Sequence, residues 1–475
     1  MFQIRKKTVW VALLAVVLIL GLVLYRPFLA DFLVANRAMN NQLVQFGNRI
    51  LFVAPHPDDE TLGGAALIQK ALAQKKQVKV VIMTCGDGYE RAVIENFGVV
   101  SPKPADYQRL GKARRAESIA ALNRLGVKQS DILFLGYPDG GTNGLWEENW
   151  DRDHLHRGRN GSDRSPYDFS YEKGAPYAGE NVVKNLSSII DQFHPTDIVY
   201  PDPHDQHHDH WATQAFVSYT LAQRKEPINE WFYLVHHGGF PAPWLYEPNR
   251  TLDPPYAFQH LDTSWHTLPM NQQEETTKHD AVNRYATQMK VMEPFLLAFI
   301  RKNDLLATYQ PPVLGKVQGT GNVQESVEKS NPLFPDAVDD TLSREFLPTA
   351  DLTAVSGIAS DDAFWVGVKS RSGSEGRITY HVRIRFFRPE GVNRLDLTVQ
   401  DSRLSAEKLA KNSMDLPAGA RLQKGSDGFW VVLPKSVLQG ATRMMMSADS
   451  YLGDQMIDKT AWRLVQANQS ANEQS

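Results

Sequence analysis

The sequence predicts an α/β protein with a Rossmann-like, mainly parallel sheet and helices on both faces, followed by an all-β sandwich-like domain and preceded by a transmembrane helix. Three observations support this fold class. Apolar, β-branched runs alternate with helical segments after residue 47, short alternating strands fill the chain after about residue 350, and an uncharged apolar run lies near the N-terminus. Alternation of the first kind is typical of a parallel sheet, and closely spaced short strands indicate a β-sandwich.

The N-terminal run, Thr8 to Tyr25, holds 18 uncharged residues and follows a basic Arg-Lys-Lys cluster. This is the minimal length of a membrane span. A cleaved signal peptide is the alternative, but no small-x-small cleavage site follows the run. We therefore expect a cytoplasmic tail at residues 1–7, a single-pass anchor in the cytoplasmic membrane at 8–25 and a stalk at 26–46. The positive-inside rule then places the catalytic domain on the periplasmic side.

The remaining chain divides by its pattern into a first domain at residues 47–314, a polar linker at 315–349, a β-sandwich-like domain at 350–465 and a disordered tail at 466–475. The first domain is expected to contain strands at Arg49 to Ala54, Val78 to Thr84, Ile132 to Leu135, Ile198 to Tyr200 and Trp231 to Val235. Its helices are expected at Thr61 to Ala73, Arg109 to Leu125, Asn181 to Phe193 and within Thr277 to Asp304.

Composition excludes two classes of protein. With 51 basic and 54 acidic residues the formal net charge is -3, which gives no sign of a nucleic-acid partner. The single cysteine, Cys85, excludes an intrachain disulfide and a cysteine-based zinc finger. A metal in this chain must therefore use histidine and carboxylate ligands.

The segment from Gly140 to Glu180 has no countable period and is rich in Gly, Asn, Asp and aromatic residues. A loop of this length in a compact domain is usually functional or disordered. Its aromatic side chains favour an ordered rim that contacts sugar rings, and a packed surface insertion is an equal alternative. The aromatic residues are Trp146, Trp150, Tyr167, Tyr171 and Tyr177.

An acidic turn, His56-Pro57-Asp58-Asp59-Glu60, lies between the first predicted strand and the first predicted helix. Ligands of open α/β sheets bind at this carboxyl edge of the strands. His56 and Asp59 are three residues apart and can converge on one point, and imidazole and carboxylate groups are usual zinc ligands. N-capping and the helix dipole also favour acidic residues here, so the turn alone leaves both interpretations open.

A second turn, from Asp205 to His210, is rich in histidine and follows the strand that ends at Tyr200. A His-rich run can be a surface tract without a function. Because both turns follow parallel strands, however, they are expected to meet at one edge of the sheet. We therefore expect His210 to join His56 and Asp59 as a zinc ligand, with a fourth position open to water as in catalytic zinc sites.

This arrangement assigns roles to the neighbouring side chains. Zinc lowers the pKa of its water ligand to about 7, and Asp58 is the candidate general base because it is not used as a ligand. His207, when protonated, is the candidate for stabilising the oxyanion. Asp209 is expected to orient His207 or a ligand through a hydrogen bond. His204 and His208 are expected to take no part.

The same residues resemble the PIG-L/LmbE deacetylases, which remove acetyl groups from N-acetylglucosamine-type amino sugars. The resemblance rests on His-Pro-Asp-Asp-Glu after the first strand, an Arg-x-x-Glu helix that ends in Leu-Gly-Val, and a late His-x-Asp-His; it spans roughly residues 47 to 310. It implies zinc ligands at His56, Asp59 and His210, a general base at Asp58 and an electrostatic partner at His207. The helix motif holds Arg114, which we expect to bind substrate.

Two further histidines, His236 and His237, follow the strand at Trp231 and are also expected to contact substrate, with loop packing as the alternative. The sequence thus predicts zinc-dependent hydrolysis of the N-acetyl group of an amino sugar in an envelope glycan or glycolipid. Two alternatives stay open: hydrolysis of another amide or ester, such as an acylated lipid, and a non-catalytic glycan-binding envelope protein.

Overall fold

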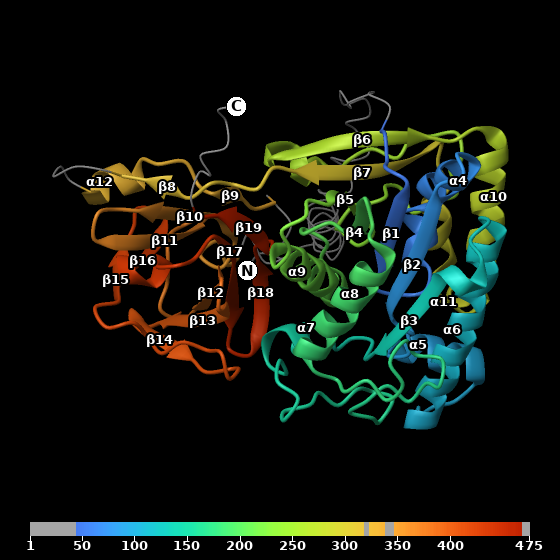
Figure 1. Cartoon of the computed structure of the whole chain (residues 1–475), viewed down its shortest axis with the longest axis horizontal. Helices are drawn as coiled ribbons and strands as arrows, with labels where there is room; N and C mark the ends of the chain where they lie inside the picture. Colours follow the sequence, from blue (N-terminus) through green and yellow to red (C-terminus); the bar gives the residue numbers. More distant parts are fainter. Residues whose placement is uncertain (1–43, 318–322, 338–345, 468–475) are drawn as a thin grey trace, which may run out of the picture.

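The first lobe of the protein is built on a seven-stranded sheet in the order β3-β2-β1-β4-β5-β7-β6 (Figure 1). The computed structural model describes residues 44–317, 323–337 and 346–467. The strands of this sheet are β1 (Arg49–Ala54), β2 (Gln77–Thr84), β3 (Ile132–Tyr137), β4 (Asp197–Pro201), β5 (Asn229–Tyr233), β6 (Thr263–Pro269) and β7 (Asn303–Tyr309). Strands β1 to β5 pair in parallel, and β7 and β6 add an antiparallel edge. The predicted α/β class with a mainly parallel sheet is confirmed.

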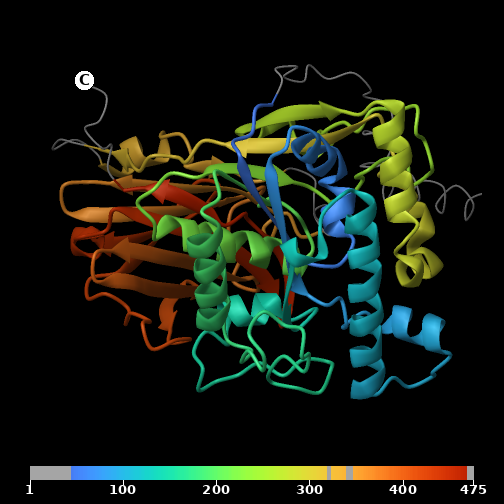
Figure 2. The same ribbon diagram turned by 45° about the vertical axis from the view of Figure 1, so that its right-hand side comes forward.

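Side chains alternate between the two faces of the sheet along each strand. Apolar residues lie on both faces, and helices cover each of them. Ile50 and Phe52 of β1 pack in the core that includes α4 and α6, whereas Leu51 and Val53 pack in the core that includes α8 and α9. Figure 2 shows α6 and α10 on the side away from the second lobe. The helices are α3 (Asp59–Leu62), α4 (Ala65–Ala73), α5 (Glu90–Phe97), α6 (Pro104–Arg124), α7 (Thr142–Glu147), α8 (Gly179–Phe193), α9 (His208–Ala222), α10 (Gln272–Val282) and α11 (Ala286–Ala298).

The second lobe consists of two sheets that share one apolar core, to which both sheets contribute side chains. One sheet contains β15 (Arg421–Lys424), β16 (Gly428–Pro434), β11 (Ala363–Ser370), β10 (Leu352–Ala359), β8 (Gly315–Lys316) and β9 (Phe334–Pro335). The other contains β14 (Arg403–Glu407), β13 (Gly391–Gln400), β12 (Thr379–Arg388), β17 (Arg443–Leu452), β18 (Gln455–Lys459) and β19 (Arg463–Gln466). The C-terminal β-sheet architecture is therefore confirmed.

The predicted linker contributes to the second lobe where it is described. Strands β8 and β9 pair with β10, and a short helix, α12 (Val323–Glu328), lies between them in the chain. Most of the predicted tail, residues 468–475, lies outside the described residues, as does nearly all of the predicted stalk. The domain boundaries themselves stay predictions.

The predicted location in the cytoplasmic membrane is corrected by the structure. Across the described ranges, no helix combines the length and the apolar character needed to cross a membrane. The segment Thr8 to Tyr25, on which the prediction of an anchor and a periplasmic catalytic domain depended, lies outside these ranges. We therefore propose neither a membrane partner nor a location in the cell envelope.

The long segment between β3 and α8 packs into the first lobe instead of forming an aromatic rim. Trp146, Trp150, Tyr167 and Tyr177 are each less than 9% exposed. The ring of Trp146 makes edge contacts with Phe216 of α9 and with other aromatic rings around it. These contacts favour the packed insertion over the sugar-binding rim.

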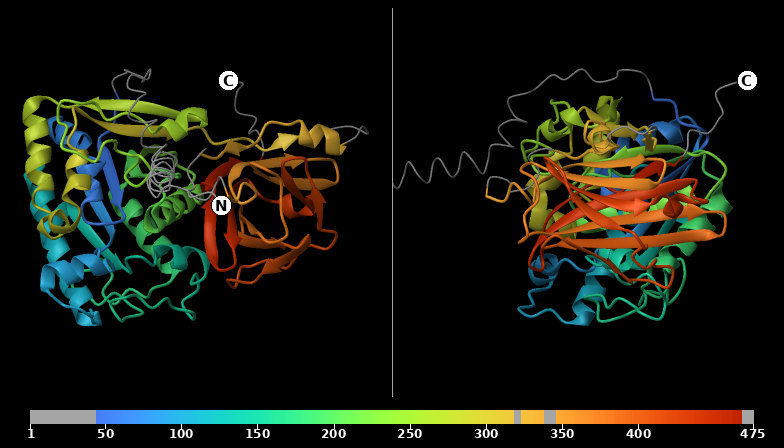
Figure 3. Two further views of the ribbon diagram at one scale, coloured as in Figure 1. Left: turned by 180° about the vertical axis from the view of Figure 1, so that it is seen from behind. Right: turned by 90° about the vertical axis from the view of Figure 1, so that its left-hand side faces the viewer.

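The two lobes meet along α7, α9 and the sheet that carries β18 and β19 (Figure 3). Trp146 and Trp462 lie in edge contact with centroids 5.2 Å apart. Arg394 donates to the carbonyl oxygens of Trp146 and Glu147, at 3.1 and 3.0 Å. Lys459 forms a salt bridge of 3.1 Å with Glu147. The lobes therefore share buried apolar and ionic contacts across their boundary.

Candidate metal centre

The first predicted turn leaves the carboxyl end of β1 and enters α3 through a strained residue. Asp58 has a φ of 133°, a left-handed backbone conformation that side chains other than glycine rarely adopt. Its backbone N–H donates to Glu60 Oε2 at 3.0 Å, and Glu60 Oε1 accepts from the hydroxyls of Ser118 and Tyr285. Glu60, the member of the motif without a predicted role, thus fixes the shape of the turn.

Three predicted ligands converge on one point. The distances from Asp59 Oδ2 to His56 Nδ1 and to His210 Nε2 are both 3.2 Å, and the two ring nitrogens are 3.2 Å from each other. The three side chains are nearly inaccessible to solvent. His210 lies in the first turn of α9, which follows β4, so the adjacent pairing of β1 and β4 brings the two turns together.

The second nitrogen of each histidine faces a buried carboxylate. His56 Nε2 lies 3.0 Å from Asp209 Oδ2 and 3.1 Å from Asp139 Oδ1. His210 Nδ1 lies 3.0 Å from Asp205 Oδ2. These contacts fix the N–H of each neutral ring on the carboxylate side, as is usual for metal-ligating histidines.

The donor set fits a zinc ion. Because both N–H groups point to carboxylates, the lone pairs of two ring nitrogens and the oxygen of Asp59 face one another. A bound cation would accept all three lone pairs and remove their mutual repulsion. A tetrahedral site with bonds of about 2.0–2.1 Å has edges of about 3.3 Å, close to the three separations of 3.2 Å. Burial lowers the pKa of His210, but Asp205 and Asp59 raise it to about 9, so a proton competes with a metal for this point.

Other side chains extend the possible donor set. Groups of histidines and carboxylates close enough to hold an ion are His56 with His207 and His210, Asp59 with His210 and His236, and His56 with Asp139 and Asp209. All three groups overlap the triangle formed by His56, Asp59 and His210. The described residues therefore place one potential metal centre at this edge of the sheet.

Asp58, the predicted base, lies beside this centre and is held by Arg114. The guanidinium Nη2 donates to Asp58 Oδ2 at 3.0 Å and to the Pro57 carbonyl at 2.7 Å, and Nη1 donates to the Gly86 carbonyl at 3.1 Å. Burial raises the pKa of Asp58 to about 7, although the charge of Arg114 acts against this shift. The structure thus directs the buried Arg114 to Asp58, while its predicted contact with substrate stays a prediction.

His207 caps the N-terminus of α9 and packs against the ring of His56, with centroids 4.7 Å apart. Its Nδ1 accepts from the backbone N–H of Asp209 at 3.2 Å, so the proton of the neutral ring lies on Nε2. Burial, followed by the proximity of His56 and His210, lowers the pKa of His207 to about 4. This pKa argues for a neutral donor instead of the protonated form expected from the sequence.

The remaining predicted histidines divide into two groups. The ring of His236 lies beside those of His207 and His210, with centroids 5.1 and 4.8 Å apart. His237 is 6% exposed and packs edge-on against Phe258, which agrees with the loop-packing alternative. The structure therefore brings His236, but not His237, to the metal centre.

Three residues of this centre had no assigned role in the sequence prediction. Asp205 holds His210, Asp139 contacts His56, and Thr142 donates its backbone N–H to Asp209 Oδ1 at 3.0 Å. The carboxylate of Asp209 contacts the candidate ligand His56, which agrees with the second of its two expected roles. The positions of Asp139 and Asp205 in the sequence could have indicated their roles, since both residues follow strands that end at the same edge of the sheet.

Two imidazoles and a carboxylate that share one point, with a further carboxylate beside them, fit a buried site for one metal ion of the catalytic type. The family follows from comparison. Residues 51–221 match the family model described as PIG-L, GlcNAc-PI de-N-acetylase. This part of the chain belongs to the PIG-L family.

Individual relatives agree with this family. The 1D-myo-inositol 2-acetamido-2-deoxy-alpha-D-glucopyranoside deacetylase of Mycolicibacterium smegmatis is 30% identical over 183 residues, covering 38% of this chain and 55% of the relative. The enzyme of the same name from Mycobacterium leprae is 34% identical over 177 residues, covering 36% and 50%. The chain thus spans about half the length of these relatives. A solved A40926 pseudoaglycone deacetylase is 21% identical with a TM-score of 0.35, covering 55% of this chain and 96% of that one.

Proposed function

We propose that this protein is a zinc-dependent deacetylase that hydrolyses the N-acetyl group of a GlcNAc-type amino sugar. The observation that carries the proposal is the triangle of His56, Asp59 and His210 with Asp58 beside it. The family match over residues 51–221 and the names of the relatives support the reaction and the class of substrate. Zinc suits a site of two nitrogens and one oxygen.

The residues of this chain divide the work of the reaction. When bound, zinc supplies positive charge that polarises the acetyl carbonyl and acidifies water. Asp58 accepts the proton of the attacking water and returns it to the amine nitrogen as the bond between that nitrogen and the acetyl carbon breaks. Arg114 keeps the carboxylate of Asp58 oriented through the contact of 3.0 Å. His207 donates its Nε2 proton in a hydrogen bond to the oxygen that becomes negative.

The replacement Asp58→Asn tests the proposal. It keeps the shape of the side chain and removes the base, so we expect acetate release from N-acetylglucosamine oligomers to fall by about 10²–10⁴-fold. Zinc content, measured by mass spectrometry, is expected to stay at the wild-type level. The matched control is Asp197→Asn, a buried aspartate at the opposite end of β4, which should retain turnover.

Two results would contradict the proposal. Near-normal turnover of the Asp58→Asn variant would reject Asp58 as the base. Failure of the zinc-loaded wild-type protein to release acetate from any amino sugar, combined with hydrolysis of acyl esters or other amides, would reject the substrate class.

A further inference from the structure

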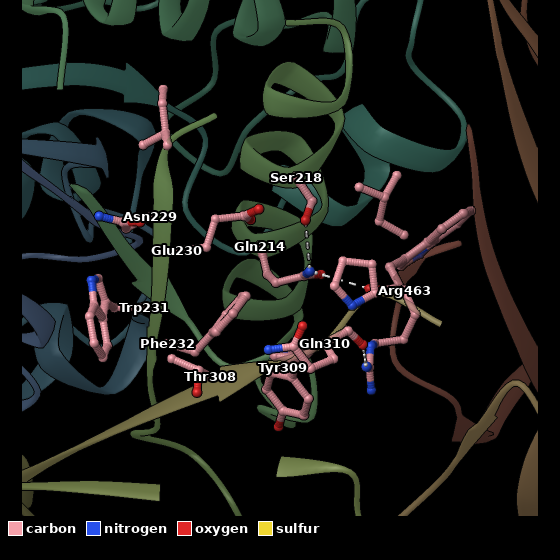
Figure 4. Close-up of a pocket in the computed structure, with 15 residues that line it drawn as sticks. Gln214, Ser218, Asn229, Glu230, Trp231, Phe232, Thr308, Tyr309, Gln310 and Arg463 are labelled. Carbon is pink, nitrogen blue, oxygen red and sulfur yellow. Dashed lines mark hydrogen bonds between the residues drawn. The ribbon is translucent and has the colours of Figure 1, made fainter. Parts of the chain in front are cut away.

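Two hollows lie along the boundary between the lobes, and both lobes line each of them. The first, of about 390 Å³, is bounded by α9, β5, the end of β7 and β19 (Figure 4). The second, of about 550 Å³, lies between the loop after β4 and the strand β18. Pro203 and Trp462 line both hollows, so they adjoin each other. Volumes of this size are typical of small-molecule sites.

The second hollow reaches the loop that carries the metal centre. His204, Asp205 and Gln206 line it, and Gln206 directly precedes His207. In the same loop, Asp205 Oδ2 holds His210 at 3.0 Å. The wall of the hollow is thus the segment that positions the zinc ligand and the proposed oxyanion donor.

A chain of hydrogen bonds forms the wall of the first hollow. Gln214 Nε2 donates to the Trp462 carbonyl at 3.2 Å and to Ser218 Oγ at 3.4 Å, and Tyr200 donates its hydroxyl to Glu230. Figure 4 shows Glu230 on β5 opposite Gln214 and Ser218 of α9. Burial raises the pKa of Glu230, which agrees with a carboxyl group enclosed between the lobes.

Each hollow also contains a buried polar side chain with an unused hydrogen-bonding atom. Gln214 is 2% exposed and lines the first hollow, and its Oε1 has no hydrogen-bond partner among the described residues. His204 is 7% exposed and lines the second, and its Nε2 likewise has no partner within the described ranges. These two atoms are therefore available to a ligand that forms hydrogen bonds.

The lining selects the chemistry of that ligand. An acyl chain would leave Glu230 and Arg463 buried against apolar groups, which is costly. A polyanion would face Glu230 together with Asp336 and Asp458. A sugar chain avoids both problems, because its hydroxyls both donate and accept hydrogen bonds, and its ring faces suit the half-buried ring of Trp231 in the first hollow.

We propose that the boundary between the lobes binds the sugar units that extend from the acetylated residue, so that the substrate is an oligosaccharide. This inference rests on the proposed deacetylase activity and deepens it. The β lobe thereby contributes to substrate selection through the strands β17 and β18, which form one wall of the hollow nearest the metal centre.

Bulky replacements in the second hollow test this role. Leu452 is 40% exposed and Gln455 is exposed, so Leu452→Trp and Gln455→Trp narrow the hollow without disturbing the core. Acetate release is measured with a disaccharide and a pentasaccharide of β-1,4-linked N-acetylglucosamine. The matched control is Leu416→Trp, at a residue of the same lobe that is 37% exposed and outside both hollows.

We expect the wild-type kcat/KM for the pentasaccharide to exceed that for the disaccharide at least tenfold. This advantage should fall at least fivefold in both hollow variants and persist in Leu416→Trp, with thermal melts confirming the fold. Equal wild-type values, or an unchanged advantage in both folded hollow variants, would overturn the inference.

A binding measurement separates this inference from the reaction. If neither saccharide releases acetate, deacetylation of N-acetylglucosamine oligomers is rejected, and calorimetric titration of the full chain with the pentasaccharide tests the boundary site alone. Binding that weakens at least fivefold in the hollow variants would support the site. Absence of binding, or binding that these variants leave unchanged, would reject it.

Discussion

Replacement of Asp205 by asparagine tests how the metal centre is held. Asp205 Oδ2 accepts from His210 Nδ1 at 3.0 Å and from the backbone N–H groups of Val235 and His236 at 3.1 and 3.0 Å. Oδ1 accepts from the backbone N–H of His207 at 3.0 Å. One carboxylate thus connects a zinc ligand, the oxyanion donor and the loop after β5.

An amide cannot reproduce these four contacts, because its NH₂ group must face at least one of the N–H donors. The lower-energy orientation keeps the oxygen toward His210 and sets NH₂ against the His207 N–H, at a cost of about 1–3 kcal/mol for the unpaired donor. Loss of the negative charge also makes His210 a poorer ligand. Replacements of this kind typically weaken metal binding about 10–100-fold, which corresponds to about 1.4–2.8 kcal/mol.

The assay is a competition titration of zinc against a chromophoric chelator, which gives the zinc Kd of each variant. Asp202→Asn is the matched control, because Asp202 is equally buried but accepts from the Tyr309 hydroxyl instead of a ligand. We expect Asp205→Asn to raise the Kd about 10–100-fold and Asp202→Asn to leave it within about twofold. A wild-type Kd in Asp205→Asn, or the same increase in Asp202→Asn, would show that the Asp205 carboxylate does not specifically support zinc binding through His210.

Two further predictions concern the base and the core. A Cβ at Gly86 (φ +62°) would collide with the guanidinium of Arg114, so Gly86→Ala should lower kcat at least tenfold while zinc stays bound. The control is Gly98→Ala (φ +66°), which should keep the wild-type kcat because no described atom lies within 4 Å of the added Cβ. Lys278 Nζ lies 2.5 Å from Asp304 Oδ1 in a fully buried pair, so Lys278→Met should destabilise the protein by about 3–5 kcal/mol in urea unfolding. A decrease in the free energy of unfolding of less than about 1 kcal/mol would show that Asp304 is not left as an uncompensated charge.

Much of the fold could be predicted because parallel strands carry local signals. The runs around β1 and β4 are apolar and β-branched, and both His-containing turns directly follow them. The antiparallel strands β6 and β7 escaped prediction, because β6 mixes polar residues with a single buried leucine and β7 closely follows a helical segment. Pairing between these two strands depends on tertiary contacts that no local pattern records.

The site was predictable in its residue types but not in its hydrogen bonds. The convergence of His56, Asp59 and His210 could be expected from two His-containing turns that follow parallel strands, whereas the partner of each imidazole depends on how the loops orient their side chains. The aromatic insertion was ambiguous for a related reason. Trp146 is buried against Trp462, more than 300 positions later in the chain, and this contact has no signature near either residue.

Restoration of activity by zinc tests whether deacetylation depends on one bound metal ion. The full chain is stripped with a chelator, zinc is added back in sub-stoichiometric steps, and acetate release from an N-acetylglucosamine oligosaccharide is measured at each step. We expect negligible activity in the stripped protein and a linear rise in activity that ends at one zinc per chain. Full activity in protein that holds less than a tenth of an equivalent of metal, or no activity at full zinc occupancy, would contradict it.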